Sequence, residues 1–581
     1  MRITRFGGID RRGPSSLQKG ICSAHTLENL RIQSDGTLRG RCGFAQVLSL
    51  PAEVRAVWSG SFAGEESVFA AAADKLYRLD LTGGSYTEIG SITAGEGKVA
   101  LFLWRGKLLC LDGVQISIYD GQTLTAVSPY VPLIANKRAA YAMTEIYEPI
   151  NLIGREARFC FRGDGENFLF YFGYAVDSIR DVYNVTQGRY YFTSDYTLSP
   201  DNYGNSILKM TSKPVDGTIF VARVILNQKY LDYSCIAACA DAAVWGDSCA
   251  DRIVCWNGTQ ASDVYCSKPV TDAQIREATS SGQVCGDLYF PEDGHFCVGD
   301  GSRPVRAACR HYDRLLLFTN GDTWMTDFTD DPSGSFAMKP INSGVGCTAP
   351  GAAALAGNDP LTVADGEIWR WSANALRRDE CSAVPIAGGI APIFSAEFSE
   401  RAFAHTCRRR NEVWFADPSD AAGRVYVYHT EFDAWYMFCG IFSDGFFPWQ
   451  GDVGFWLGNR FYCFDEALAW DWDDDGEYPI GVQLVLDGLD FAADTQPLHL
   501  TRLALDLDGE HPAFALTLAT DRGRTRRIEF AAGGEPGACV RFDRPVQSGR
   551  FRALRLTLAA DDAPRLHLRG LCMTAEPGSR K

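Results

Sequence analysis

The sequence predicts an all-β fold: a β-propeller of six or seven blades with an inserted β-sandwich and a C-terminal β-sandwich. Short strands with aromatic edges recur along the chain and end at turn residues, as in Lys75–Asp80, Glu367–Trp371 and Arg460–Asp465. Their β-branched and aromatic residues are typical of half-buried strands. Four-stranded units repeated around an axis form a propeller. No catalytic signature recurs with these strands.

Length and composition narrow the class of protein. A chain of 581 residues is too long for one compact core, so we expect two to four domains. The 46% hydrophobic and 12% aromatic content indicates well-filled interiors. The formal charge of −16 argues against a DNA-coating protein, because neutralising phosphates requires a basic face. An acidic channel through which DNA passes without sticking is consistent with this charge.

Targeting segments and disulfides are not expected. Residues 1–8 lack the apolar stretch of a signal peptide, and no run of 18 apolar residues occurs, so we expect synthesis in the cytosol and no membrane span. The nineteen cysteines are an odd number, and many lie inside strand-like runs. This distribution favours reduced, buried cysteines over a disulfide framework.

The rhythm of strands and turns divides the chain into five segments. Blade-like spacing breaks near residue 130, resumes near residue 243 and gives way to longer alternating strands near residue 478. The segments are an N-terminal lead-in that closes on the propeller (1–50), a first propeller part (51–129), the inserted β-sandwich (130–232), the propeller remainder (233–476) and the C-terminal β-sandwich (477–581).

Two local predictions are specific. Strands within 306–326 are expected to form a meander, and Asn320-Gly321 predicts a type I′ hairpin turn. One helix is expected over Thr271–Thr279, with Thr271 or Asp272 as its N-cap.

Metal binding has weak support. Asp471, Asp473, Asp475 and Gly476 match positions 1, 3, 5 and 6 of a calcium loop, but Val482 stands where the bidentate glutamate belongs. A solvated turn between domains is the favoured interpretation. Seven cysteines between residues 235 and 297 form no C-x-x-C pair and have only His295 nearby, so zinc spacing is poor. No cofactor or metal is predicted.

Catalytic motifs are also missing from the sequence. There are eight histidines, and no G-x-S-x-G, Walker A, G-x-G-x-x-G or H-E-x-x-H pattern occurs. Pairs of carboxylates suited to glycoside hydrolysis can be chosen freely from 72 acidic residues, so such a pair carries little information. The segment 320–324 is faintly similar to the Asp-box turn of sialidase propellers, but a hairpin turn alone is the favoured explanation. We therefore predict that the chain is not an enzyme.

A group of arginines near the C-terminus is a candidate interaction surface. The favoured interpretation is a solvated strand face balanced by Asp506, Asp508, Asp521 and Asp543; the alternative is an electrostatic docking face toward a neighbouring acidic ring. The arginines are Arg524, Arg526, Arg527, Arg550, Arg552 and Arg555.

Several segments together resemble one family, and their order along the chain matches it. The opening segments are Phe6–Asp10, Leu27–Leu30 and Asp35–Gly43; later ones are Tyr130–Pro132, Tyr147–Ile153, Asp287–Glu292, Val298–Gly301, Tyr312–Trp324, Gly344–Gly351 and Asp473–Ile480. This set resembles the bacteriophage tail accessory (nozzle) or packaged-DNA stabilisation propellers, in the prophage branch with an inserted sandwich domain.

The resemblance implies a structural protein of the virion tail, assembled in the bacterial host cytoplasm. It implies a ring of six or twelve copies below the portal that retains packaged DNA, with portal or adaptor protein and tail tip or fibres as partners. Double-stranded DNA would pass through without sequence readout. No catalytic residues carry over. The alternatives are a receptor- or glycan-binding tail protein, based on 13 Trp, 23 Tyr and the C-terminal sandwich, and a propeller glycosidase.

Overall fold

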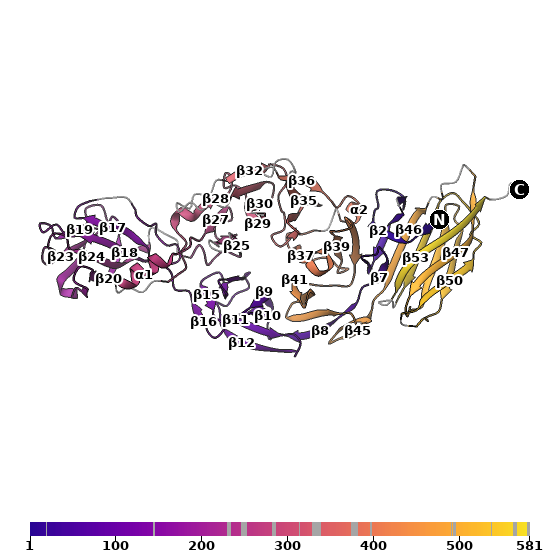
Figure 1. The fold of residues 1–581 in the computed structure, drawn as a ribbon, viewed down its shortest axis with the longest axis horizontal. Helices are drawn as coiled ribbons and strands as arrows, with labels where there is room; N and C mark the ends of the chain where they lie inside the picture. Colours follow the sequence, from indigo (N-terminus) through magenta and orange to yellow (C-terminus); the bar gives the residue numbers. More distant parts are fainter. Residues whose placement is uncertain are drawn as a thin grey trace.

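A computed structural model describes the chain except for residues 19, 143–145, 229–233, 246–251, 282–285, 313, 328–337, 374–380, 395–397, 490, 492–495, 536, 562–565 and 578–581. The described residues form an elongated molecule in which three bodies lie in a row (Figure 1). The propeller is central, with the inserted sandwich at one end and the C-terminal sandwich at the other. The predicted all-β propeller class is confirmed.

Seven four-stranded antiparallel units surround one axis in the described part of the chain, which sets the blade number at seven. Five of them are separate sheets, and the sixth and seventh belong to larger sheets. The first two blades are β9 (Val54–Phe62), β10 (Glu65–Ala72), β11 (Lys75–Asp80) and β12 (Ser85–Ser91), then β13 (Ala100–Trp104), β14 (Lys107–Leu111), β15 (Ile116–Tyr119) and β16 (Leu124–Ala126). The third and fourth are β25 (Asp241–Trp245), β26 (Arg252–Trp256), β27 (Asp263–Cys266) and β28 (His295–Cys297), then β29 (Val305–His311), β30 (Arg314–Thr319), β31 (Thr323–Asp327) and β32 (Met338–Asn342).

The fifth and sixth blades continue the series with β33 (Ala353–Ala356), β34 (Asp359–Ala364), β35 (Glu367–Ala373) and β36 (Cys381–Pro385), then β37 (Phe403–Cys407), β38 (Glu412–Ala416), β39 (Val425–His429) and β40 (Ala434–Phe438). The seventh is composite. Its strands β41 (Gly445–Trp449), β42 (Asp452–Leu457) and β43 (Arg460–Asp465) are followed by β8 (Gly43–Ser49) from the N-terminal part of the chain.

Strand β8 closes the propeller. It pairs antiparallel with β43, with Phe44 opposite Phe464 and Ser49 opposite Arg460. The chain then passes directly from β8 into β9, the inner strand of the first blade, and β9 in turn neighbours β41. The first and last blades are therefore joined through backbone hydrogen bonds, which leaves no open seam in the wheel.

Buried side chains fill the space between neighbouring blades. Between the first two blades, Phe62 lies 5.2 Å from Phe69 and 5.7 Å from Tyr119, measured between ring centroids, and all three are buried. Burial of each such ring stabilises the fold by about 1.5–3 kcal/mol. The alternation of apolar residues along each strand places one set against each flanking blade.

The inserted body is a sandwich of two sheets. Its larger sheet contains β17 (Leu133–Ala139), β18 (Glu156–Arg162), β24 (Ile219–Leu226), β20 (Val176–Asn184) and β21 (Arg189–Tyr190); the smaller contains β19 (Leu169–Tyr171), β23 (Ser206–Met210) and β22 (Tyr196–Pro200). Both sheets contribute phenylalanines to the core: Phe159, Phe161, Phe170 and Phe220 are fully buried.

The C-terminal body shares a sheet with the propeller. The sixth blade continues through β5 (Thr26–Glu28) into β46 (Val482–Leu489), β52 (Leu554–Ala560), β48 (Phe514–Thr520) and β49 (Thr525–Phe530), giving nine strands. The second sheet contains β50 (Cys539–Pro545), β47 (Leu498–Asp508), β53 (His567–Pro577), β7 (Leu38–Gly40) and β6 (Leu30–Ile32), with β1 (Arg2–Ile3) and β51 (Arg550–Phe551) at its side.

The N-terminal lead-in is thus divided between two bodies. Strand β8 joins the propeller, whereas β1, β6 and β7 pair in the C-terminal sandwich and β5 bridges the two. A small sheet of β2 (Arg5–Ile9), β4 (Ile21–Ala24) and β3 (Leu17–Gln18) lies against β40. Sequence patterning could not anticipate this, because the partners are some 500 residues away along the chain.

Helix α1 (Asp272–Ser280) confirms the predicted helix. Thr271 is its N-cap and forms a capping box with Gln274. The remaining described elements include a helical turn α2 (Ala391–Phe394), the 3-10 turns η1 (Thr193–Asp195), η3 (Glu292–Gly294) and η4 (Arg408–Arg410), and a hairpin of β44 (Trp470–Asp473) and β45 (Gly476–Pro479). Among the described residues, no helix is long and apolar enough to span a membrane.

The β30–β31 hairpin forms as expected, but the predicted turn type is wrong. A type I′ turn needs a positive φ at both central residues, and neither Asn320 nor Gly321 has one. Instead the amide of Thr319 donates to the carbonyl of Asp322 at 2.9 Å, and the Thr319 hydroxyl bonds the Asp322 carboxylate. These bonds close a longer loop.

Gly43 tests the close packing of β8 against β44 within the seventh blade's sheet. A Cβ at this position would collide with the carbonyl oxygen of Trp470 and lie 2.7 Å from its carbonyl carbon. We expect Gly43→Ala to lower the free energy of unfolding by about 3 kcal/mol, because backbone atoms must move to admit the methyl group. Gly13→Ala, where a Cβ meets nothing within 4 Å, is the control and should change stability by less than about 0.5 kcal/mol. Equal urea midpoints for the two variants would contradict this role of β8.

Candidate functional site

Two buried polar junctions connect the propeller to the sandwiches, and they contain residues from the segments that carry the family resemblance. Asn29 lies at the first, the C-terminal junction, with a left-handed backbone (φ 54°) that asparagine tolerates better than most residues. Its side chain donates to the carbonyl of Gly481 at 2.7 Å and accepts from Arg41 Nε at 3.0 Å and the amide of Cys439 at 2.9 Å. One side chain thus holds the propeller, the N-terminal segment and the C-terminal sandwich together.

Arg41 uses all five of its N–H groups at this junction, where it is 2% exposed. Besides Asn29, they reach the carbonyls of Cys42 (3.1 Å) and Cys439 (3.2 Å) and both oxygens of Asp471 (2.8 and 2.5 Å). Burial raises the pKa of Asp471 above its ordinary value, and Arg41 opposes that shift. A fully satisfied guanidinium fixes geometry in a way that a point charge does not.

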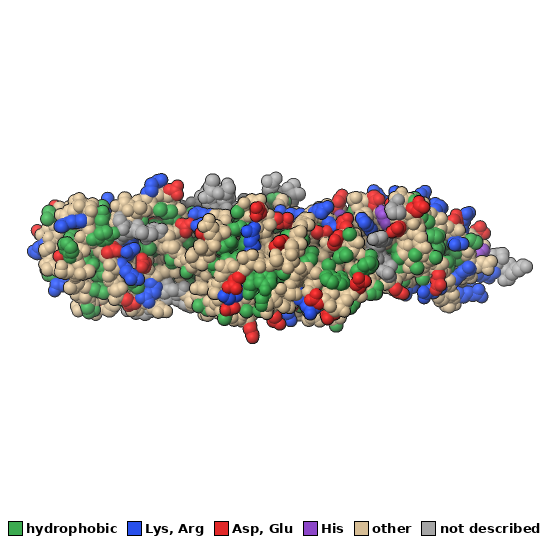
Figure 2. Space-filling model, turned by 90° about the horizontal axis from the view of Figure 1, so that it is seen from below, with side chains coloured by type: hydrophobic (Ala, Val, Ile, Leu, Met, Phe, Trp, Pro, Cys, Tyr) green, Lys and Arg blue, Asp and Glu red, His purple; other side chains and the backbone are tan. Residues whose placement is uncertain are grey.

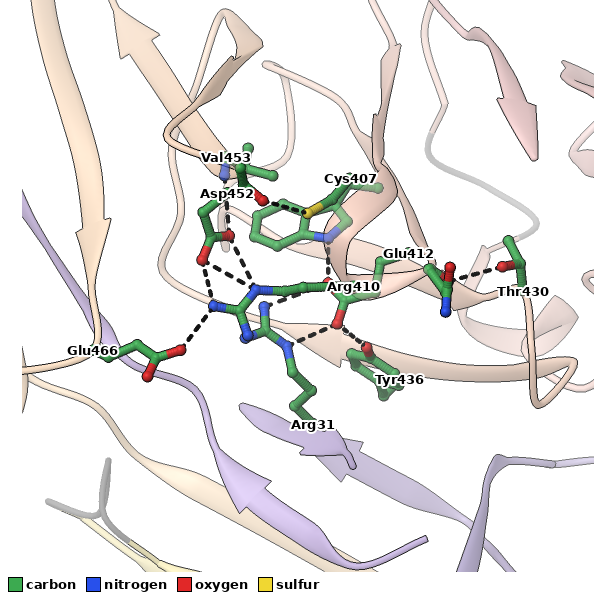
Figure 3. Close-up of polar contacts among 12 residues, drawn as sticks. Arg31, Cys407, Arg410, Glu412, Thr430, Tyr436, Asp452, Val453 and Glu466 are labelled. Atoms are coloured by element: carbon green, nitrogen blue, oxygen red, sulfur yellow. Dashed lines mark hydrogen bonds and ion pairs between the residues drawn. The ribbon is translucent and has the colours of Figure 1, made fainter. Parts of the chain in front are cut away.

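A second buried ion pair, Arg31 with Glu412, also belongs to the C-terminal junction (Figure 3). Arg31 Nε is 2.8 Å from Glu412, whose carboxylate also accepts from the hydroxyl of Tyr436 at 2.5 Å and from the indole of Trp414 at 2.8 Å. Although burial acts to lower it, Glu412 holds the pKa of Arg31 above its usual value. The carboxylate is saturated by protein donors, so it is not free to act as an acid or base.

Arg410 completes the cluster at the edge of the propeller. Its Nε lies 3.1 and 3.0 Å from the two oxygens of Asp452, and its Nη2 lies 3.2 Å from Glu466 (Figure 3). Burial acts to raise the pKa of Asp452, but the hydrogen bonds from Arg410 keep it below its ordinary value. A cavity of about 540 Å³ adjoins these residues and has side chains of both charges in its walls. The buried charged side chains at the boundary between the propeller and the C-terminal sandwich are thus paired with one another.

The insertion junction is built in the same way. Glu148, 8% exposed, accepts from the hydroxyl of Tyr130 (2.9 Å), the amide of Leu133 (2.5 Å) and Gln274 of α1 (2.7 Å). Gln274, which forms the capping box of α1, therefore also holds Glu148 in place. The donors come from two segments, the entry to β17 and the helix α1, so the carboxylate ties these together.

Asn151 is the fully buried centre of the insertion junction. Its amide nitrogen donates to the carbonyls of Tyr130 (2.8 Å) and Leu288 (3.1 Å), and its oxygen accepts from the amide of Phe290 at 3.0 Å. Tyr130 and Leu288 lie on either side of the insertion in sequence. Asn151 thus adds side-chain hydrogen bonds to the short backbone bridges at the point where the chain enters and leaves the inserted body.

The calcium-like run does not bring its carboxylates to one point. Asp471 faces inward, with both oxygens bound to Arg41, and Asp473 and Asp475 form the tip of the β44–β45 hairpin, where Asp473 accepts from the amide of Asp475 at 2.8 Å. Among the described residues, no group of three or more His, Cys, Asp or Glu side chains could hold a metal ion. Asp471 is therefore a structural partner of Arg41, and the expectation of a wholly solvated turn is wrong at this residue.

The cysteine-rich stretch lies mainly in the interior of the third blade. Cys235, Cys239, Cys255 and Cys266 are buried, and burial raises the pKa of Cys266 to about 12. Protonated thiols are poor metal ligands. Cys249 and Cys285 lie outside the described residues.

The six C-terminal arginines are all exposed, and they are divided between the two sheets of the sandwich. Arg526 and Arg527 lie on β49, the terminal strand of the nine-stranded sheet, whereas Arg550 lies on β51. The loop at 547–549 contacts Arg524 and accepts a hydrogen bond from Arg526 at 3.4 Å. Arg555 lies 3.8 Å from Asp487 on β46, and Arg552 begins the turn into β52.

Carboxylates also line one mouth of the propeller axis, at the N-terminal ends of the inner strands. The cavity there has a volume of about 1020 Å³. Its lining includes four carboxylates, Glu53, Glu96, Glu400 and Asp444, and three basic residues, Arg55, Lys98 and Arg401. Asp444 accepts from the amide of Gly458 at 2.8 Å and from Arg401 at 3.4 Å. We refer to this opening as the acidic mouth.

Comparison with known proteins identifies no family. No family model and no curated protein matches the chain. Solved structures with a similar fold include the WD40 domain of SCAP from fission yeast (8% identity, 72% of this chain and 94% of that one, TM-score 0.29) and a glycoside hydrolase (9%, 90% and 98%, TM-score 0.22). Another is an exo-β-1,3-galactanase from Phanerochaete chrysosporium (8%, 87% and 100%, TM-score 0.17). Such low TM-scores say nothing about activity.

The C-terminal junction can be tested by breaking its ion pair. We expect Arg41→Gln to lower the free energy of unfolding by about 3–5 kcal/mol, because it leaves the buried Asp471 carboxylate without its partner. The double variant Arg41→Met, Asp471→Leu should recover much of that loss, since it buries no charge. Urea denaturation of the three proteins measures both effects.

The control for this prediction is Arg12→Gln. Arg12 pairs with Asp10 at 2.9 Å, but its side chain is 69% exposed, so its removal should change stability by less than about 0.5 kcal/mol. If Arg41→Gln is as mild as Arg12→Gln, the junction does not depend on the buried pair.

Proposed function

We propose that the chain is a non-catalytic structural component of a bacteriophage head–tail connector or tail hub. Copies would form a ring below the portal, retain packaged DNA and carry tail parts. The observation that carries this proposal is the position of the motif residues. Asn29, Arg41 and Asn151 belong to segments that resemble the nozzle family, and each fixes one body against another.

Rigidity between bodies supports a mechanical role. Domains joined only by a linker or a small interface are expected to move relative to one another. Here a nine-stranded sheet runs from the propeller into the C-terminal sandwich, and buried hydrogen-bonded charges cover the same boundary. A protein that transmits force, or that keeps neighbouring copies in a fixed position, needs a rigid connection of this kind between its bodies.

Charge is distributed unevenly along the chain, which supports contacts between copies. The propeller segments 51–129 and 233–476 contain 23 basic and 44 acidic residues, a charge of −21, whereas 1–50 and 477–581 contain 22 basic and 17 acidic residues, a charge of +5. Several Lys and Arg side chains lie at the C-terminal end of the face drawn in Figure 2. A basic end and an acidic middle favour head-to-tail contacts, the type that closes into rings.

The same charge suits a channel wall for DNA. A strongly acidic propeller repels phosphates, so DNA that passes near it would not be retained by non-specific binding. Retention of the genome would then depend on the width of the ring. Portal or adaptor protein above the ring and tail tip or fibre proteins below it are the partners that this position implies.

If contacts of the arginine-bearing edge strand β49 hold the ring together, reversing the charge of that strand should separate the copies. We expect the purified chain to form a closed oligomer of six or twelve copies, and Arg526→Glu with Arg527→Glu to shift it to monomer, since both changes reverse charge on the exposed strand β49. Native mass spectrometry measures the copy number. Cryo-electron microscopy of virions should place the protein at the tail vertex.

The matched control reverses two exposed arginines on the inserted sandwich, Arg180→Glu with Arg189→Glu, and should leave the oligomer intact. A monomer at all concentrations, with or without portal protein, argues against the ring. Detection of the protein only in infected cytosol, and not in virions, would remove the structural assignment altogether.

A receptor- or glycan-binding tail protein is the second candidate, and one observation favours it. Exposed aromatic side chains gather on the inserted sandwich, with Tyr190 45%, Phe192 72% and Tyr203 90% exposed. Aromatic faces are common platforms for sugar rings and protein partners. Among the described residues of the C-terminal sandwich from β46 onward, no large hydrophobic side chain is similarly exposed.

A glycan array separates the two functions. The second candidate requires reproducible, competable binding that Phe192→Ser with Tyr203→Ser abolishes, while an exposed control, Asn202→Ala, leaves it unchanged. Binding that survives the aromatic substitutions, or no binding on the array, would contradict it.

A further inference from the structure

The second mouth of the propeller axis differs in charge from the acidic mouth. It lies at the C-terminal ends of the inner strands β29, β33 and β37 and opens on a cavity of about 600 Å³. Three arginines line this cavity: Arg310 at the end of β29, and Arg408 and Arg409 in the turn η4 that follows β37. We call it the basic mouth.

The three guanidinium groups have no anionic partner in the described part of the chain. Arg310 Nε donates to the carbonyl of Tyr312 at 2.7 Å, and neither Arg408 nor Arg409 forms an ion pair there. One carboxylate, Asp452, also lines the cavity, but Arg410 binds both of its oxygens. The basic mouth therefore gathers positive charge that the protein itself does not neutralise.

This gathering is unexpected in a body with a charge of −21. Arginines scattered over an acidic surface would find carboxylates nearby, as Arg78 finds Glu65 at 3.2 Å and Arg370 finds Asp359 at 2.8 Å. Like charges in one concave site repel one another unless a counter-ion is present. The planar guanidinium group matches oxyanions, because its N–H groups form paired hydrogen bonds with two oxygens.

A half-buried histidine also lines the cavity. His405 on β37 is one of its wall residues. Burial lowers the pKa of His405 to about 4, so the ring is neutral near pH 7 and adds no positive charge to the site. The positive charge of the basic mouth therefore comes from the three arginines.

We propose that the basic mouth binds a small multivalent oxyanion of the phosphate class, with Arg310, Arg408 and Arg409 as the charged donors. The cavity is large enough to admit phosphate or pyrophosphate with its hydrating water. This site goes beyond the proposed structural role and does not depend on it, because it requires only one copy of the chain.

Calorimetric titration with inorganic phosphate and with pyrophosphate, at constant ionic strength set with sodium chloride, tests the site. We expect saturable binding, with pyrophosphate tighter because it carries more charge. The variant Arg408→Gln with Arg409→Gln should weaken binding by about tenfold or more. Arg310→Gln is the second variant and should weaken it in the same direction if the double variant folds poorly.

The matched control is Arg522→Gln with Arg544→Gln, two exposed arginines of the C-terminal sandwich outside any cavity of this kind. It removes the same charge and should leave the affinity unchanged. Absence of saturable binding at millimolar phosphate and pyrophosphate overturns the proposal. So does an equal loss of affinity in the control, because that result would show a general charge effect.

Discussion

The five-fold hydrogen bonding of Arg41 is the interaction on which the rest of the structure depends. It lies where the propeller, the N-terminal segment and the C-terminal sandwich meet, and it binds Asp471, which is 430 residues away in the sequence. A buried ion pair stabilises little in net terms, because desolvation offsets most of the attraction. The hydrogen bonds of Arg41 instead determine how the bodies are oriented relative to one another. Every donor of Arg41 specifies one acceptor, so the bodies can dock in a single orientation.

Buried polar side chains join the propeller to the sandwich at each of its two ends. Asn29 and Asn151 are buried amides that bond to backbone groups of segments far apart in sequence. Each side chain supplies donors and acceptors to backbone groups at the ends of short pairings, which would otherwise be left without a partner. Polar residues that a search for catalysis would notice are thus engaged in joining bodies. A chain built in this way is suited to work as a rigid part.

The fold class and the helix α1 could be predicted from the sequence, because both depend on local patterns of residues. Strand composition and spacing indicate a propeller, and Thr271 with Gln274 forms a capping box within four residues. The turn at Asn320 was misjudged because the bond between Thr319 and Asp322 overrides the preference of the Asn-Gly pair. The Arg41–Asp471 pair could not be predicted, since neither residue has a local signal and Asp471 lies in a run that resembles a calcium loop.

Strand β8 has a consequence for biosynthesis. Its partner β43 is more than 400 residues downstream, and the partners of β1 lie at residues 571–572. The segment that leaves the ribosome first must therefore wait, unpaired, until almost the whole chain has been made. Such long-range pairing slows folding and exposes strand edges in the meantime. A truncated product ending before β43 would leave the propeller open, because β8 would then have no strand to pair with.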